Sequence, residues 1–392
     1  MSAPVRPAAP AMSEREQIEQ LLKAHFVDAG FPYVELPLVE KTDHFLDLMS
    51  DEVRRRTHAF SGQDGDEYWV RSDFTLSACR RIANAAPPRN AVKVSYGGFV
   101  YRNQSYERPM FQRGAGAEAL HAGIECFRPA GELEADAMVF VAAQKAVVKA
   151  GVQSHRVLVG DLSLFPAIVT QLDLSDVAKG RLLSRFWRQT RADAFIGGLR
   201  NETAKRAQTR PLISLLSRGT PDEARDAILE LFALADIQAI GQRPLEDIIA
   251  RLLEQAADAA DLGVSGGIVD ALDAFFKIDE PTDACIAHLK SFSRAAKIDL
   301  APQIARLEQR FAQILSSGGD LAGARFKTDL GKDTGYYTGF CFEIWDKELS
   351  KACPLFAAGG RYDKLIRTLG AQKDCPAVGA TVFIDAICER LR

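Results

Sequence analysis

The stretch FAAGGRYDKL, residues 356–365, sets an apolar run, two glycines and several polar side chains next to one another. Glycines in a strand-like run allow a small ligand to approach the backbone closely. Arg361, Tyr362 and Asp363 follow at once, beside the space that the glycines leave. The stretch therefore predicts the end of a buried strand that borders a ligand site.

Other strand-like runs lie on both sides of a long helical block. Those before it are EYWVRSDFT (67–75), AVKVSYGGFVYR (91–102), ALHAGIECF (119–127) and RVLVGD (156–161). Those after it are ARFKTDL (324–330), GFCFEIW (339–345), PLFAAGG (354–360) and AVGATVFID (377–385). Because these strands do not alternate with helices, the pattern predicts an α+β fold in which a helical insertion interrupts one sheet.

Helix and turn signals divide the chain into three parts. Ser13 and Glu16 have the spacing of a capping box, which predicts that the first helix begins there. The expected parts are a flexible tail at 1–12, a sheet domain at 13–162 and 319–392, and a helical insertion at 163–318.

Composition indicates an ordinary globular protein. Hydrophobic residues make up 47% of the 392-residue chain and the net charge is -3, which gives no overall attraction to nucleic acid. The chain has no apolar run long enough for a membrane span, and its start lacks the apolar region of a secretory signal. The seven cysteines form no C-x-x-C pair, so we expect isolated thiols in the cytoplasm and neither zinc nor disulfides.

Two pairs of polar residues on strand-like segments are candidates for a ligand site. Asp73 and Thr75 end a strand, although Asp73 could also cap the helix that follows. His121 and Glu125 lie four apart on a strand and therefore face the same side. A carboxylate among Ala, Gly and Ile is costly to bury without a partner, which favours a ligand site at Glu125.

Arginines and tyrosines extend the candidate site. Arg102, Arg108 and Arg113 lie on a strand-loop-strand segment, where guanidinium groups suit phosphate or carboxylate oxygens. Tyr336 and Tyr337 lie between two glycines, and a tyrosine ring with its polar tip suits a planar polar ligand such as an imidazole. The two tyrosines could equally be interior aromatics beside a tight turn.

Taken together, these segments resemble the class II aminoacyl-tRNA synthetases, specifically the catalytic domain of histidyl-tRNA synthetase. YVELPLVE (33–40) resembles motif 1, a proline-containing strand at the dimer interface, and residues 99–127 resemble motif 2. GYYTGFCFE and AGGRYDKL resemble the two stretches typical of the histidine enzymes, and PAVGATVFIDAI (376–387) lies at the position of motif 3. The resemblance implies an antiparallel sheet flanked by helices.

The resemblance also implies which residues would bind histidine. In this sequence the matching positions are Asp73, Thr75, His121, Glu125, Lys332, Tyr336 and Tyr337, with Gly359 and Gly360 beside them. Asp73 replaces a glutamate and His121 replaces a glutamine of the family pattern. Arg102 and Arg113 would be residual phosphate-site arginines. No catalytic residue, metal or cofactor is expected.

The nucleotide half of the family's site is altered. Ala386 replaces the ATP-binding arginine of motif 3, Gln104 replaces the adenine-recognising glutamate of motif 2, and Lys332 replaces a catalytic arginine. The sequence ends at Arg392, where the synthetases continue into an anticodon-binding domain. We therefore do not expect this chain to charge tRNA.

This pattern resembles the regulatory subunits of short-form ATP phosphoribosyltransferase, which catalyses the first step of histidine biosynthesis. The resemblance implies a non-catalytic cytoplasmic protein that assembles with the short catalytic subunit, forms a homodimer through the motif 1 region and mediates feedback inhibition by histidine. Whether histidine binds in the synthetase-like pocket or at a subunit interface stays open, as does the stoichiometry.

Further features leave alternatives. The segment 179–210 is rich in lysine and arginine, which suits a solvated face, an interface with the catalytic subunit or, third, a contact with RNA. Retained Arg102 and Lys332 keep open a free-standing enzyme that activates an amino acid with ATP. A tRNA-binding module with the same fold is the other alternative, against which the mildly acidic composition argues.

Overall fold

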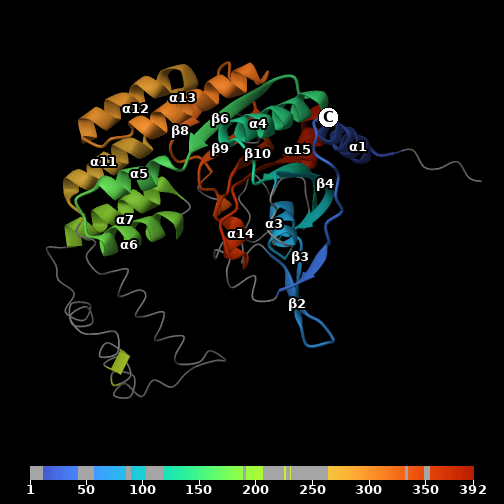
Figure 1. Cartoon of the computed structure of the whole chain (residues 1–392), viewed down its shortest axis with the longest axis horizontal. Helices are drawn as coiled ribbons and strands as arrows, with labels where there is room; N and C mark the ends of the chain where they lie inside the picture. The colour runs from blue at the N-terminus through green and yellow to red at the C-terminus, as the bar shows by residue number, and fades with distance from the viewer. Residues whose placement is uncertain are drawn as a thin grey trace, which may run out of the picture. The chain divides into compact units, whose positions relative to one another are not determined.

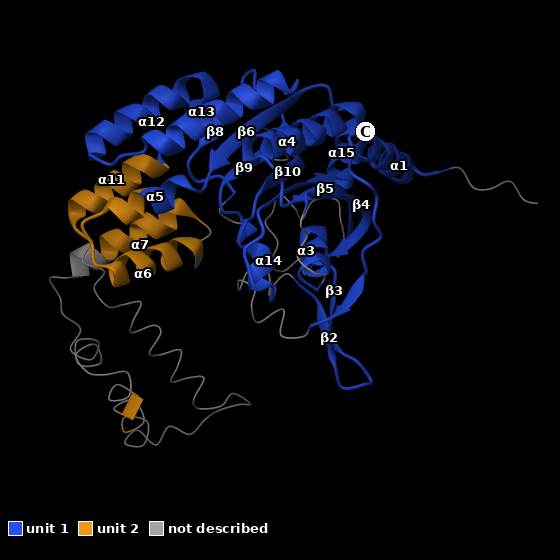
Figure 2. Ribbon diagram, in the orientation of Figure 1, with its two compact units in different colours: residues 1–167, 277–392 blue, residues 168–276 orange. Residues whose placement is uncertain are grey.

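The computed structural model describes residues 12–42, 57–84, 90–102, 118–188, 191–205, 225–226, 230, 264–331, 334–347 and 354–392. Contacts divide the chain into two compact units (Figure 2). Unit 1 comprises residues 1–167 and 277–392, and unit 2 comprises residues 168–276. Of the predicted flexible tail, only Met12 is among the described residues.

Unit 1 is built on an eight-stranded sheet with the order β4-β5-β11-β10-β9-β6-β8-β7 (Figure 1). The strands are β4 (Val92–Tyr101), β5 (Glu118–Phe127), β6 (His155–Asp161), β7 (Asp279–Pro281), β8 (Arg325–Lys327), β9 (Phe340–Asp346), β10 (Leu355–Arg361) and β11 (Ala377–Phe383). Neighbours are antiparallel except β6 and β8, which are parallel. The predicted antiparallel sheet is thus confirmed apart from this one pair, whose long connection provides the crossover that parallel strands require.

Helices complete unit 1. They are α1 (Glu14–Asp28), α3 (Phe74–Asn84), α4 (Glu132–Lys149), α12 (Thr282–Ala296), α13 (Ala301–Ser316), α14 (Leu365–Thr368) and α15 (Ile384–Leu391). Helix α4 packs against the central strands β5, β9, β10 and β11, and α13 packs on α4. The predicted capping box is confirmed: Ser13 Oγ accepts a hydrogen bond from the Glu16 amide, and Glu16 accepts one from the Ser13 amide.

A small sheet with the order β1-β3-β2 also belongs to unit 1. It consists of β1 (Val39–Lys41), β2 (Ala59–Ser61) and β3 (Glu67–Val70). The strand predicted at 33–40 is wrong over most of its length, because only its last residues pair within this sheet and Tyr33 forms an isolated bridge. The guanidinium of Arg71 donates to the carbonyls of Leu36 at 2.8 Å and Pro37 at 3.1 Å, so a side chain replaces the neighbouring strand there.

Unit 2 is helical where it is described. Helix α5 (Leu164–Gln171) leads into it, and α6 (Asp176–Arg188), α7 (Ala192–Lys205) and α11 (Gly266–Phe276) follow. Phe186, Phe195 and Phe275 are fully buried and form its aromatic core. Further helix starts that the sequence suggests at 220–223 and 243–246 lie outside the described residues.

The helical insertion predicted at 163–318 and the compact units have different limits. Helices α12 and α13 belong to unit 1, in which α13 packs on α4, whereas the predicted insertion includes them. The limits of the insertion stay a prediction. In the basic segment, Arg191 pairs with Asp193 and Arg200 pairs with Asp273. Among the helices of the described residues, none has both the length and the apolar character that a membrane span requires.

Candidate functional site

The carboxylate of Glu125 is the centre of the candidate site. Glu125 lies on β5 and is 0% exposed. Its Oε1 accepts hydrogen bonds from Thr75 Oγ1 at 2.7 Å and from the Tyr96 hydroxyl at 2.9 Å. Its Oε2 accepts a hydrogen bond from the Tyr362 hydroxyl. Side chains from α3, β4 and the residue after β10 therefore hold one buried carboxylate in place.

Glycines on the neighbouring strands make room for this group. Glu125 pairs in register with Gly379 on β11, and Gly379 pairs with Gly360 on β10. A Cβ atom on Gly379 would lie 1.5 Å from Glu125 Oε2, and one on Gly360 would lie 3.0 Å from Tyr337 Cδ2. At Gly359 a Cβ atom would lie 2.6 Å from a ring carbon of Phe342. The predicted close approach to these glycines is thus made by side chains of the protein.

Asp73 joins the site through Tyr336. Asp73 Oδ1 accepts a hydrogen bond from the Thr75 amide at 2.8 Å, which is the helix-cap interaction that the sequence suggests as one possibility. Its Oδ2 accepts a hydrogen bond from the Tyr336 hydroxyl at 3.2 Å. The Tyr336 ring meets the rings of Tyr337 and Tyr362 edge-on, with centroids 5.3 and 5.9 Å apart. Asp73 therefore both caps α3 and faces the tyrosines beside Glu125.

His121 and Arg102 lie next to this cluster in the fold. The imidazole of His121 is 3% exposed and packs edge-on against Phe383 at a centroid distance of 5.0 Å. Burial, together with the positive charges of Arg102 and Arg71, lowers the pKa of His121 well below its usual value. Arg102 Nε donates to the Ser72 carbonyl at 2.8 Å. His121 is therefore a neutral, packed side chain.

The electrostatics of Glu125 are unusual for a carboxylate. Burial raises its pKa to about 7, although the hydrogen bonds from Tyr362, Thr75 and Tyr96 act in the opposite direction. The negative charge of Asp73 raises it further. Glu125 thus changes its charge near neutral pH, where an exposed glutamate is fully ionised.

This pKa predicts how stability depends on pH. The folded protein holds a proton on Glu125 between about pH 4.5 and 7 that the unfolded chain has released, so the free energy of unfolding should fall as the pH rises through this window. Glu125→Gln removes the titration. Its unfolding free energy relative to wild type should therefore increase by up to about 3 kcal/mol from pH 5 to pH 8, measured by urea unfolding. A difference that does not change with pH would contradict the raised pKa.

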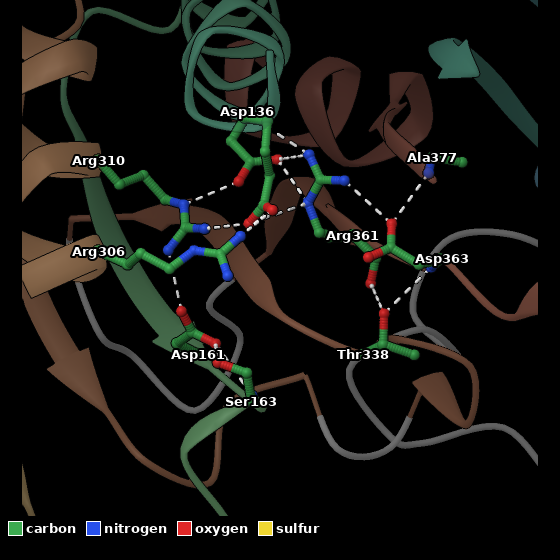
Figure 3. A network of polar contacts seen from close by, with 10 residues as sticks. Asp136, Asp161, Ser163, Arg306, Arg310, Thr338, Arg361, Asp363 and Ala377 are labelled. Atoms are coloured by element: carbon green, nitrogen blue, oxygen red, sulfur yellow. Dashed lines mark hydrogen bonds and ion pairs between the residues drawn. The ribbon is translucent and has the colours of Figure 1, made fainter. Parts of the chain in front are cut away.

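A second polar cluster contacts β10 from the side of α4 (Figure 3). Asp136 of α4 is 0% exposed and accepts hydrogen bonds from Arg361 at 2.6 Å and from Arg310 at 2.7 Å. Arg310 also donates to Asp161 at 2.9 Å, and Arg361 to Asp363 at 3.0 Å. Both guanidinium groups are almost completely buried. The cluster ties α4, α13, β6 and β10 together.

Adjacent residues of the FAAGGRYDKL stretch belong to different clusters. Successive side chains of an extended chain point to opposite faces, so Arg361 reaches Asp136 while Tyr362 reaches Glu125. Arg361 is thus held in an ion-pair cluster of the protein, and Tyr362 is the polar residue of this stretch that contacts Glu125.

The structure assembles part of the predicted set around Glu125. Thr75 contacts the carboxylate, Asp73 and Tyr336 form the adjoining pair, and Tyr337 and Gly360 pack beside them. Gly359 faces the other side of the sheet, against Phe342. Lys332 and Arg113 lie outside the described residues. Whether these residues bind histidine stays a prediction.

Three further residues of the site were not among those predicted to bind histidine, although Tyr362 belongs to the FAAGGRYDKL stretch. Tyr96 and Tyr362 donate hydrogen bonds to Glu125, and Gly379 provides the space for it. The isolated glycine in AVGAT was a usable signal, because a glycine inside a strand marks a close approach. In the described residues, no group of three His, Cys, Asp or Glu side chains could hold a metal ion, and six cysteines are free thiols.

Comparison with known proteins shows which family and which solved structures the whole chain resembles. The family model described as histidyl-tRNA synthetase matches residues 7–267 and 245–387. The chain belongs to the histidyl-tRNA synthetase family. Solved structures share the fold: an ATP phosphoribosyltransferase regulatory subunit/histidyl-tRNA synthetase from Bacillus halodurans has a TM-score of 0.61, with 18% identity over 100% of this chain and 84% of that one. Histidyl-tRNA synthetase from Nostoc sp. PCC 7120 has a TM-score of 0.60, with 14% identity over 100% and 75%.

Curated relatives of this histidyl-tRNA synthetase family member are named ATP phosphoribosyltransferase regulatory subunit. The protein of Brucella anthropi is 28% identical over 358 residues, which cover 90% of this chain and 92% of the relative. That of Brucella canis is 29% identical over 360 residues, which cover 90% and 92%. The predicted class II synthetase fold and the predicted resemblance to regulatory subunits are both confirmed.

Proposed function

We propose that this chain is a regulatory subunit of ATP phosphoribosyltransferase and that the Glu125 site binds histidine as its effector. The chain does no chemistry itself in this proposal. It assembles with a short-form catalytic subunit in the cytoplasm, raises the activity of that subunit and transmits inhibition by histidine. Curated relatives that align with 90% of this chain carry the name of such a subunit.

The observation that carries the proposal is the contrast between the two halves of the site. The amino-acid half keeps several groups of the family pattern, although Asp73 and His121 differ from it: Glu125 has three hydroxyl donors, and Asp73 contacts Tyr336. In the nucleotide half, Ala386 stands where the family has an arginine, and its neighbour Asp385 accepts a hydrogen bond from the Leu120 amide at 2.8 Å. A site that keeps amino-acid contacts without that arginine suits sensing better than activation.

Self-association belongs to the same proposal. The chain forms a homodimer through the motif 1 region at 33–40, in which Leu38 and Val39 are each 42% exposed. Nucleic acid is not a partner in this proposal, consistent with the net charge of -3.

The test is the activity of the cognate short catalytic subunit with and without this chain, over a range of histidine concentrations. Activity should rise when the chain is added and fall again with histidine. Glu125→Ala should keep the activation but raise the histidine concentration for half-inhibition about tenfold or more, because a hydrogen bond to a charged group contributes about 1.5 to 3 kcal/mol. Glu308→Ala, an exposed carboxylate on α13, is the matched control and should behave as wild type.

Two results would count against the proposal. If the chain leaves the activity of the catalytic subunit unchanged, it is not a regulatory subunit. Amino-acid-dependent pyrophosphate exchange would then favour the alternative that it activates an amino acid with ATP, and binding of bulk tRNA would favour the third candidate. If Glu125→Ala is inhibited like wild type, the effector binds elsewhere.

A further inference from the structure

Among the described residues, Glu125 has no positively charged hydrogen-bond partner. Within the part of the chain that the structure describes, its three hydrogen-bond partners are the neutral hydroxyls of Thr75, Tyr96 and Tyr362. A buried carboxylate is expensive to keep ionised unless a cation pairs with it. The ionised form of Glu125 therefore receives hydrogen bonds but no countercharge from the residues that the structure describes.

The other titratable groups around Glu125 do not supply that countercharge. Those that interact with it are Asp73 and Cys79 of α3, Tyr96 of β4, Cys126 of β5, Tyr337 before β9 and Tyr362 after β10. Each of them is neutral or negative and never positive, so none supplies a countercharge, and the negative charge of Asp73 disfavours ionisation of Glu125. His121, four residues away on the same face of β5, is itself held neutral.

We propose that the pocket binds its effector with one proton shared between the Glu125 carboxyl and a ligand group that titrates near neutrality, such as an imidazole. This inference rests on the proposed function. With one proton, the pair is either a carboxylic acid beside a neutral ring or a carboxylate beside a cationic ring. In both forms a donor faces an acceptor and the pair has no net charge.

The neighbouring protonation states are worse. With two protons, the carboxylic acid and the cationic ring both present donors, and the pair carries a positive charge. With none, the ring can still donate, but an uncompensated negative charge remains buried beside Asp73. The two titrations are therefore coupled, and the complex holds one proton over a wider pH range than either free partner does.

The balance of protons follows from the two ordinary titrations. Free imidazole titrates near pH 6.5 and Glu125 at about 7. At about pH 8.5 both free partners have lost their proton, so binding must take up close to one. At about pH 5.5 both are protonated, so binding must release close to one. Affinity should be greatest between these values and fall up to about tenfold per pH unit toward either side.

Calorimetry on the full chain with L-histidine tests this, in pairs of buffers that differ in ionisation enthalpy. We expect proton uptake near one at about pH 8.5 and release near one at about pH 5.5, so that the sign reverses. Glu125→Gln, an amide of the same shape that cannot titrate, should take up less than about a quarter of a proton at pH 8.5 and lose the alkaline decline in affinity. Glu308→Gln should keep the wild-type profile.

The possible failures can be told apart. If histidine binds with an affinity that is constant within about twofold from pH 5.5 to 8.5, or with no reversal in proton exchange, the shared proton is wrong while the proposed effector pocket stands. The same holds if Glu125→Gln exchanges as many protons as wild type. If histidine does not bind at any pH, although circular dichroism shows the chain folded, both proposals are overturned.

Discussion

Replacing Asp136 by alanine is expected to lower the free energy of unfolding by about 3 to 5 kcal/mol. Asp136 is completely buried and accepts hydrogen bonds from both Arg310 and Arg361. Without it, two buried guanidinium groups lose the carboxylate that they share. Removing one partner of a buried ion pair costs this much because the remaining charge stays out of water. Urea unfolding followed by circular dichroism and tryptophan fluorescence measures the change.

Two controls separate charge from other effects. Asp136→Asn keeps the volume, so a loss of similar size would assign the effect to the missing charge and not to a cavity. Arg306→Ala removes an outer member of the same cluster, whose side chain is 56% exposed and paired with Glu132. An exposed ion pair contributes at most about 1 kcal/mol, so this variant should stay close to wild type. Equal losses for Asp136→Ala and Arg306→Ala would contradict the importance of the buried charges.

The cluster around Asp136 could not be predicted from the sequence. Its members come from α4, α13 and β10, and Arg310 and Asp136 are separated by 174 residues. Arg310 appears in the sequence as an ordinary polar residue of an amphipathic helix. Nothing local distinguishes an arginine that is 2% exposed from one on the surface, because burial is decided by which helices pack together.

The order of the strands and helices along the chain was easier to predict from the sequence. The strands were predicted from their apolar runs and the start of α1 from its capping box, and both signals are local. The prediction of a strand at 33–40 was wrong for a nonlocal reason. The guanidinium of Arg71 donates hydrogen bonds to the carbonyls of Leu36 and Pro37, where a neighbouring strand was expected. The parallel β6–β8 pair is equally nonlocal, since it joins one strand from each of the two chain segments that make up unit 1.

The candidate site was predictable to the extent that side-chain alternation and family motifs define it. Glu125 and Thr75 were predicted from the strand pattern and the resemblance, and the structure joins them. The same alternation was not applied to residues 361–363, so Arg361, Tyr362 and Asp363 were all placed beside a ligand. In the structure Tyr362 contacts Glu125, whereas Arg361 contacts Asp136. The partners of Glu125 include one 237 residues away, which no local pattern can identify.

The two clusters also bear on each other. Arg361 and Tyr362 are adjacent, so the ion pair with Asp136 restrains the backbone that carries the Tyr362 hydroxyl to Glu125. A buried, fully hydrogen-bonded network gives a site a rigid frame, which a sensor needs if a small ligand is to favour one arrangement over another. The structural cluster thereby supports the geometry of the proposed effector pocket.

Gly379→Ala is expected to displace the Glu125 carboxylate and break its hydrogen bonds with Thr75, Tyr96 and Tyr362. The new Cβ would lie 1.5 Å from Glu125 Oε2 and 2.8 Å from the Ile124 carbonyl. The carbonyl belongs to the paired strand β5 and cannot move without breaking the ladder, so the carboxylate must leave its three hydroxyl donors. Overpacking of this kind costs about 1 to 3 kcal/mol of stability. Histidine affinity, measured by calorimetry at neutral pH, should fall at least about tenfold.

The cause can be isolated with a double variant and a matched control. If the clash with the carboxylate dominates, Gly379→Ala should cost clearly less stability in a Glu125→Ala background, because the group it strikes is absent. Gly197→Ala on α7 adds the same methyl group with nothing within 4 Å, and should be neutral or slightly stabilising because alanine favours a helix. A Gly379→Ala protein that binds histidine as tightly as wild type would mean that the effector does not use the Glu125 carboxylate. Tight binding would then place the effector site elsewhere and leave Gly379 a purely structural role in the sheet.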